Sequence, residues 1–264
     1  MATELKLHIG VRNGRSAITE SFFTSPLKLG TPNTPGERLK VVMMMASAGV
    51  LKGDSFQYEI ICDADTKTLL TEQSYTKIFD TGEGKAEKQQ SVTVEENASF
   101  YYRPCAAVPF EGSTYNGEMK VCLKKNSEFA YADIVTAGRV GMGERFRFRH
   151  YKNRVCVWAE DKPVWMDHCL LEPDFMDLEG MIFFAGFTHQ GTFYYYGSTE
   201  QEEKLLEFFS EQKENDLMHD LNEQRIRCGA SKALKGVCVR VLAHTAQDIE
   251  ERFDEIEELL ELVK

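Results

Sequence analysis

Residues 131–148 have the sequence YADIVTAGRVGMGERFRF, and this stretch decides our prediction of the fold. A strand-like run that carries Asp133 leads into a loop with three glycines. Glu144 then leads out of the loop into residues 146–149, where aromatic and basic side chains alternate as they do in a β-strand. The pattern therefore predicts a β-hairpin at the middle of the chain.

Two interpretations of this stretch are open at the level of sequence. In the first, the glycines supply positive backbone dihedrals, and Glu144 forms a solvated ion pair with Arg139. In the second, Asp133 and Glu144 point into one polar site, because the apolar neighbours Ile134 and Val135 indicate partial burial. A carboxylate that is buried without a partner is costly, so we expect Asp133 to be paired.

Short strand-like segments separated by turn signals make up most of the chain. They comprise residues 4–11, 17–23, 39–46, 55–62, 66–79, 89–94, 98–102, 119–123, 154–159, 164–171, 181–187, 192–196 and 229–243. We expect a hairpin from the first two, strand pairs within 66–79 and across 160–163, and a proline-rich loop at 31–36. There is no βαβ rhythm and no repeat of fixed length, so the pattern alone favours a sandwich or a barrel.

Two helices are predicted near the C-terminus. Ser198 opens a capping box for the first helix, and Thr245 is the N-cap of the second. The second helix has an apolar stripe at Ile249, Phe253, Ile256 and Leu260. Its opposite face is strongly acidic, and we expect that face to be exposed to solvent.

The composition limits the class of protein. The 264 residues carry a net charge of -11, which argues against nucleic acid and anionic membrane as partners. Residues 248–261 carry -7 and residues 200–216 carry -5, so the acidity belongs to the two helical stretches and does not indicate a cation site elsewhere. Seven cysteines without a Cys-x-x-Cys motif, and a start that lacks signal-peptide features, predict reduced thiols in a cytoplasmic protein.

Few residues carry chemistry that the sequence alone can identify. Asp54 follows Gly53, where an Asp is an ordinary turn cap. Asp167 and Cys169 lie on one face of a predicted strand with His168 on the other, so the three cannot chelate one ion, although Asp167 alone can join Asp133. The chain has no Gly-x-Ser-x-Gly, no His-Glu-x-x-His and no clustered histidines, and we therefore expect it not to be an enzyme.

The motif DIVTAGR at 133–139, followed by GERF at 143–146, resembles the urease accessory protein family UreD, also called UreH. Further segments match the family in the same order, namely GVLKGD at 49–54, the pair Thr76-Lys77 and the proline-flanked stretch 103–111. The resemblance spans most of the chain, from about Phe22 to the last helix. Its specificity lies in the ordered set of motifs, since each one is short.

The resemblance implies a mainly-β fold: a wound, β-helix-like body of many short strands with two C-terminal α-helices. We adopt this fold as one domain, residues 1–264, with a β body at 1–197 and a closing helix-strand-helix segment at 198–264. The implied function is a non-enzymatic urease maturation factor with no tightly bound cofactor. It would bind the urease apoprotein and the accessory proteins UreF and UreG, pass nickel(II) in transit, and allow a dimer of heteromeric complexes.

The resemblance also assigns roles to residues. The nickel transit residues would be Asp54, Asp133, Glu144 and Asp167, along an internal polar path that includes Thr76 and Lys77. The structural turn residues would be Gly49, Gly53, Gly138, Arg139 and Gly143. Two other functions stay open from the residues themselves: a β-rich protein-interaction module without a metal role, and a cysteine- or acid-dependent hydrolase whose motifs are not recognised.

Overall fold

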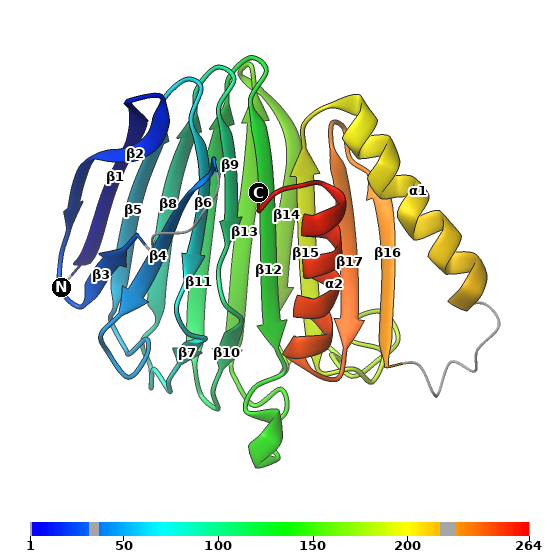
Figure 1. Cartoon of the computed structure of the whole chain (residues 1–264). Coiled ribbons are helices and arrows are strands. Elements are labelled where there is room, and N and C mark those ends of the chain that lie inside the picture. Colours follow the sequence, from blue (N-terminus) through cyan, green and yellow to red (C-terminus); the bar gives the residue numbers. More distant parts are fainter. Residues whose placement is uncertain (1, 32–36, 217–224, 264) are drawn as a thin grey trace.

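The computed structural model describes residues 2–31, 37–216 and 225–263. Within these ranges the strands form two facing sheets, wound as a β-solenoid-like body of about four turns, and two α-helices lie on one of its faces (Figure 1). The mainly-β class and the wound body with two C-terminal helices are therefore confirmed.

The seven-stranded sheet is largely parallel. In spatial order its strands are β14 (Lys162–Leu171), β13 (His150–Ala159), β11 (Thr114–Leu123), β8 (Ala86–Val94), β5 (Ser55–Cys62), β1 (Ala2–Arg12) and β2 (Arg15–Phe23). The pairs β1–β2 and β13–β14 are antiparallel, which confirms the predicted N-terminal hairpin and the predicted pair across residues 160–163. The strands between them run parallel to one another.

The ten-stranded sheet faces the first and continues beyond it. Its main path is β16 (Ile226–Lys232), β17 (Val237–Ala243), β15 (His189–Tyr196), β12 (Glu128–Thr136), β9 (Ser99–Arg103), β6 (Lys67–Glu72), β4 (Leu39–Met45) and β3 (Leu27–Gly30). The short strands β7 (Thr76–Ile78) and β10 (Ala107–Pro109) pair with each other, and β10 also pairs with β12. Strands β16 and β17, from the predicted closing segment, extend this same sheet.

The chain passes alternately from one sheet to the other, so each new strand lies beside the strand of the previous turn. Parallel pairing in register then places similar side chains next to one another along the interior. Phe129 of β12 pairs with Phe100 of β9, and their rings are stacked. Tyr151 of β13 pairs with Tyr115 of β11 in the same way. These aromatic rows hold consecutive turns together.

The predicted mid-chain hairpin is wrong. Strand β12 lies between β9 and β15 in the ten-stranded sheet, whereas β13 lies in the other sheet. The glycine loop, which contains the short 3-10 helix η1 (Val140–Met142), carries the chain across from one sheet to the other. Residues 146–149 are not a strand, because Phe146 has a left-handed φ of 51°, which interrupts the extended conformation, and its ring packs against Phe184.

Three smaller predictions also need correction. Residues 181–187 form turns instead of a strand, and residues 229–243 contain parts of two antiparallel strands, β16 and β17, where one strand was expected. Strands β6 and β7 do not pair with each other, because β6 pairs with β4 and β9. Of the predicted loop at 31–36, all but Thr31 lies outside the described residues.

The body has two layers of apolar packing. One lies between the two sheets; the other lies between the ten-stranded sheet and the helices α1 (Thr199–Asp216) and α2 (Ala246–Leu259). Strand β12 contributes to both, since Phe129 and Tyr131 face the other sheet while Ala130 and Ala132 face the helices. At Gly191 the second layer is tight, because a Cβ there would lie 2.5 Å from Ile249 Cγ2 of α2.

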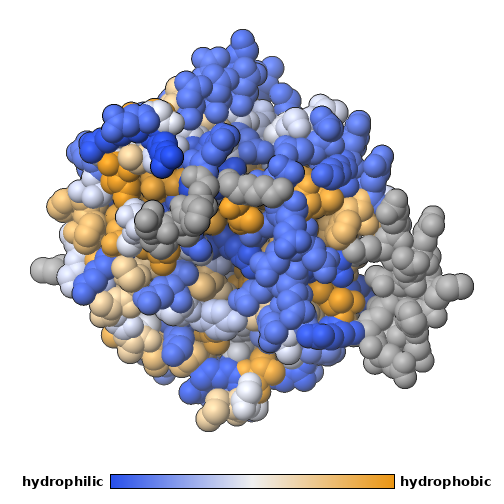
Figure 2. All heavy atoms as spheres, in the orientation of Figure 1, coloured by the Kyte–Doolittle hydropathy of each residue, from blue (hydrophilic) through white to orange (hydrophobic). Residues whose placement is uncertain are grey.

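The predicted N-cap and apolar stripe of α2 are confirmed, but its acidic face is not wholly exposed, because Asp248 and Glu257 are buried. Thr245 is its N-cap, with a side chain that accepts a hydrogen bond from the Asp248 backbone N–H, and Ile249, Phe253 and Ile256 are fully buried against the sheet. Figure 2 shows a largely hydrophilic surface where α2 crosses the sheet. In the described part of the chain no helix is both long enough and apolar enough to span a membrane.

Candidate functional site

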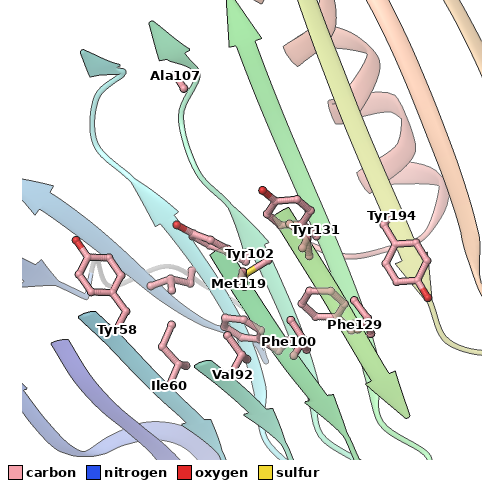
Figure 3. Packing of buried hydrophobic residues seen from close by; sticks show 14 of the residues in the cluster. Tyr58, Ile60, Val92, Phe100, Tyr102, Ala107, Met119, Phe129, Tyr131 and Tyr194 are labelled. Atoms are coloured by element: carbon pink, nitrogen blue, oxygen red, sulfur yellow. The ribbon is translucent and has the colours of Figure 1, made fainter. Parts of the chain in front are cut away.

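Two adjoining cavities lie between the sheets. Residues 47–50 and the segment 73–77, which enters β7, form part of the wall of the larger one. The larger has a volume of about 260 Å³ and the smaller of about 40 Å³. Both are lined by Glu72, Thr76, Lys88 and Tyr115, so these four residues form the junction between the cavities. Figure 3 shows the neighbouring Tyr58, Tyr102 and Tyr131 with their hydroxyl groups pointing in the same direction, away from the phenylalanine rows.

Strand register explains why polar side chains gather at this level of the interior. In the seven-stranded sheet, Lys88, Gly117 and Asn153 lie side by side on β8, β11 and β13. Gly117 leaves room between its neighbours, because a Cβ there would lie 2.7 Å from Asn153 Oδ1. In the facing sheet, Asp133 and Thr192 are register partners on β12 and β15. Each inward position is therefore one member of a row that crosses several turns.

Glu72 and Lys88 form the charged centre of the junction. Lys88 Nζ lies 3.3 Å from Glu72 Oε1 and 3.2 Å from the Tyr102 hydroxyl, and only 16% of the Lys88 side chain is exposed. The Thr76 hydroxyl donates to Glu72 Oε2 at 3.2 Å. Burial alone would lower the pKa of Lys88, but the surrounding tyrosine hydroxyls and the Glu72 carboxylate raise it well above its usual value. The amine is therefore charged at neutral pH.

Asp133 lines the smaller cavity and is paired, as the sequence predicted. Its partner is neutral: Asn153 Nδ2 donates to Asp133 Oδ2 at 2.7 Å, and the same amide lies 3.2 Å from the Tyr131 hydroxyl. Burial raises the pKa of Asp133, the Asn153 hydrogen bond opposes this rise, and the charge of Asp167 adds to it. Asp133 is therefore held by a neutral partner, and burial disfavours its charge.

Asp167, by contrast, is held in an ion pair. Arg240 of β17 donates to both carboxylate oxygens of Asp167, with 3.1 Å between Arg240 Nη1 and Asp167 Oδ2, and it also contacts the Thr192 hydroxyl. The row on the ten-stranded sheet thus runs from Asp133 through Thr192 to Arg240. A cation that approaches Asp167 has to compete with this guanidinium.

The predicted path residues Thr76 and Lys77 both line the larger cavity. Thr76 points to Glu72, whereas the Lys77 side chain is exposed. Gly49 lies against β7 with a φ of 156°, and a Cβ there would lie 2.5 Å from the Lys77 carbonyl oxygen. The turn at Gly49 therefore approaches the wall of the larger cavity closely because it lacks a side chain.

Asp54 and Glu144 lie outside both cavities. Asp54 accepts a hydrogen bond from the Leu51 backbone N–H at 2.8 Å, beside Gly53 with a φ of 80°, so it caps its own turn. Glu144 is buried, and its two oxygens bind the Arg139 guanidinium and the Glu111 backbone N–H. Glu144 thus pairs with Arg139, as in the first interpretation, but its carboxylate is buried and not solvated, and it does not share a polar site with Asp133. A role of either residue in nickel transit stays a prediction.

The glycine loop around Glu144 needs its glycines. Gly138 has a φ of 123°, and a Cβ there would lie 3.1 Å from the Glu144 carbonyl oxygen. Gly143 has a φ of 74° and ends η1 in the left-handed conformation. The motif of residues 133–146 is therefore one folded unit: a strand with an inward carboxylate, followed by a crossing loop that Glu144 and Arg139 lock.

Residues 1–263 match the family model described as UreD urease accessory protein. The chain belongs to this family. It is 30% identical over 270 residues to the urease accessory protein UreD of Acetivibrio thermocellus, an alignment that covers 99% of this chain and 95% of the relative. It is 34% identical over 186 residues to UreH of Helicobacter pylori strain P12, with 70% of each chain covered, and 36% identical over 177 residues to UreH of Helicobacter hepaticus, with 67% and 70% covered.

In this UreD-family chain, the junction residues Glu72 and Lys88 were missed by the sequence analysis, as were Asn153 and Arg240. The sequence did contain one signal, which could have identified Lys88. In β8, residues 86, 88, 90, 92 and 94 share a face, and Val92 and Val94 are plainly core residues. Lys88 therefore had to point inward with them, and an inward lysine needs a carboxylate. No comparable signal identifies Glu72 as that carboxylate, because the two residues come from different sheets.

The site of this UreD-family protein does not have the features of a thiol hydrolase. Cys105 lines the smaller cavity, but burial raises its pKa to about 11, which disfavours the nucleophilic thiolate. Among the described residues there is no group of three or more His, Cys, Asp or Glu side chains placed to hold a metal ion together.

Proposed function

We propose that this protein is a non-enzymatic scaffold for urease maturation that helps deliver nickel along its internal polar path. Membership of the UreD urease accessory protein family supports a role in urease maturation. The single observation that supports the path is the pair of adjoining cavities, with Glu72 and Thr76 at their junction and Asp133 in the wall of the smaller one.

The ligand chemistry of the path suits passage more than storage. Nickel stands high in the affinity order for nitrogen and sulfur ligands, so a wall of His and Cys would hold it tightly. Carboxylate and hydroxyl oxygens bind it more weakly and permit successive release, by the same logic that governs ion conduction. Glu72 and Asp133 are separate carboxylates in the cavity walls, and the Thr76 hydroxyl and the Asn153 amide that bind them are neutral partners that ligand exchange can displace.

The partners follow from this role. We propose that the protein binds the urease apoprotein and the accessory proteins UreF and UreG, and that the nickel ion is cargo and no resident cofactor. We further propose a cytoplasmic location and assembly as a dimer of heteromeric complexes. Co-purification of urease subunits and accessory proteins with the untagged chain from its native cells would test these partners directly.

The decisive experiment measures the nickel content of urease. In cells that lack this protein, at ordinary nickel supply, we expect urease polypeptides at normal levels but without metal. Replacing Asp54, Asp133 and Asp167 together by Asn should leave complex assembly intact and lower nickel per assembled complex. Normal nickel content with all three residues replaced would reject the path and leave a scaffold without a metal role.

A further inference from the structure

The position of Lys88 is unusual for a wall that is proposed to pass cations. Its ammonium group lies at the junction of the two cavities, 5.1 Å from the centre of the Tyr58 ring and 5.9 Å from that of Tyr102. It also occupies the same carboxylate oxygen, Glu72 Oε1, that the Tyr102 hydroxyl contacts at 3.2 Å. A permanent positive charge thus sits where a metal ion would meet Glu72.

The Glu72 carboxylate is surrounded by donors. Its Oε1 faces Lys88 and Tyr102, and its Oε2 accepts from Thr76. Only 13% of the Glu72 side chain is exposed, so water screens these contacts little. A carboxylate of this kind would bind a divalent cation firmly if the ammonium were absent, because Asp133 lines the same cavity and is a second carboxylate near the ion.

We propose that Lys88 is a resident cation that prevents Glu72 from retaining a divalent metal ion. The proposal rests on the proposed function, in that the metal is taken to enter this junction. An entering ion displaces the ammonium from Glu72, and the Tyr58 ring, whose centre is already 5.1 Å from Lys88 Nζ, continues to stabilise the displaced charge. The returning ammonium then displaces the metal. Lys88 thereby makes the junction a point of exchange and not a binding site.

The test removes the charge and keeps the length of the side chain. The full untagged chain carrying Lys88→Met is equilibrated with nickel chloride alone, and bound metal is measured by equilibrium dialysis. We expect the variant to gain one nickel ion per chain, retained at least about tenfold more tightly than by the wild type. Glu72→Gln in the Lys88→Met background should abolish the gain.

A matched control separates this effect from a general change in charge. Lys120 lies in the adjacent strand β11, but it is exposed on the outer face of the sheet, 5.6 Å from the centre of the Trp158 ring. Lys120→Met should bind nickel as the wild type does. Background binding by surface side chains is common to all these proteins and cancels in the comparison.

Three results would overturn the proposal: a folded Lys88→Met protein with no gain in nickel, a gain that survives Glu72→Gln, or an equal gain in Lys120→Met. If Lys88→Met does not fold, Lys88→Gln replaces it. If neither variant folds, nickel retention is compared between the wild type and Glu72→Gln alone. Retention by the wild type that Glu72→Gln abolishes would overturn the proposal, because it would show that Lys88 does not prevent binding. No such retention agrees with the proposal.

The outcome can be distinguished from failure of the proposed function. A gain in Lys88→Met together with normal urease nickel when Asp54, Asp133 and Asp167 are all replaced by Asn would reject nickel transit and leave the electrostatic role of Lys88 standing. No gain in Lys88→Met together with low urease nickel in Asp133→Asn would reject the role of Lys88 and leave transit standing.

Discussion

Asp133 and Asp167 show how one residue type takes two roles within the same interior row. Asp133 is paired with the neutral Asn153 amide, and burial raises its pKa. Asp167 is paired with the charged Arg240 guanidinium. A carboxylate with a neutral partner can accept a cation without breaking an ion pair, whereas one with a guanidinium partner supports the fold.

This difference predicts that the same substitution, Asp to Asn, changes the free energy of unfolding less at Asp133 than at Asp167. Asp133→Asn should leave the free energy of unfolding within about 1 kcal/mol of the wild type, because it removes a charge that burial disfavours. Asp167→Asn should cost about 1–2 kcal/mol, since Arg240 loses its partner while remaining partly exposed to water. Urea unfolding measures both. Equal losses in the two variants would mean that Asp133 is structural, and a loss of urease nickel in Asp133→Asn alone would separate function from stability.

His189 predicts a pH dependence of stability. Its ring is buried, with Nδ1 at 2.8 Å from the Thr188 hydroxyl oxygen, and burial lowers its pKa from 6.5 to about 4. Between these values the unfolded chain binds a proton that the folded chain does not, so stability is full above pH 6.5 and falls as the pH drops toward 4. The contribution is on the order of 3 kcal/mol.

The comparison with His189→Gln isolates this contribution. Urea unfolding from pH 7 to pH 4 should show a shallower loss of stability for the variant than for the wild type, because Gln does not titrate. All other titrating groups are common to both proteins. Parallel profiles would contradict the assignment of the loss to His189.

At the scale of the element, helix α2 differs from the sequence expectation on its acidic side. Ile249, Phe253 and Ile256 bury the predicted apolar stripe, but Glu257 is also buried and does not belong to the solvated face. The Tyr101 hydroxyl donates to Glu257 Oε1 at 2.6 Å, and Arg103 forms an ion pair with the same oxygen. These contacts of Glu257 with Tyr101 and Arg103 hold the helix against β9.

Glu257→Gln should therefore destabilise the protein, although the sequence predicted an exposed acidic face, on which such a change costs little. We expect a loss of about 1–3 kcal/mol in the free energy of unfolding, because Arg103 keeps its charge without its closest partner. Glu258→Gln is the matched control, since Glu258 is exposed on the same helix and its loss should change stability by less than about 0.5 kcal/mol. Equal effects of the two substitutions would show that the contacts of Glu257 with Tyr101 and Arg103 do not contribute to the free energy of unfolding.

At the scale of the whole molecule, the second apolar layer makes the ten-stranded sheet depend on α2. A chain ending at Ala243 would expose the sheet surface that Ile249, Phe253 and Ile256 cover, at a loss of roughly 1.5–3 kcal/mol per large side chain. We expect this chain to be insoluble or unfolded, and a chain shortened only by its last two residues to behave as the wild type. Size-exclusion chromatography and circular dichroism distinguish the two results. A soluble, folded chain ending at Ala243 would show that α2 is dispensable.

The sequence by itself determined the positions of most strands, the caps of the helices and the family. Alternation of side chains in β5 and β13 reports which residues share a face, and Thr245 followed by an apolar stripe specifies α2. These signals are local, since each depends on residues within about two turns of a helix or a few residues of a strand. For the same reason they hold whatever the rest of the chain does.

Apart from the two antiparallel pairs β1–β2 and β13–β14, only the tertiary structure decided which strands pair, and it alone decided which polar groups meet. The glycines at 138–143 allow the chain to reverse, but they do not specify whether the next strand joins β12 or crosses to the facing sheet, and the hairpin prediction failed there. The contacts of Lys88 with Glu72, and of Arg240 with Asp167, join residues far apart in the sequence. Each such pair arises from the register of several strands. Register is set by hydrogen bonds between strands and by packing between sheets. Neither of these leaves a pattern within the sequence of one strand, so the sequence alone did not predict the pairs.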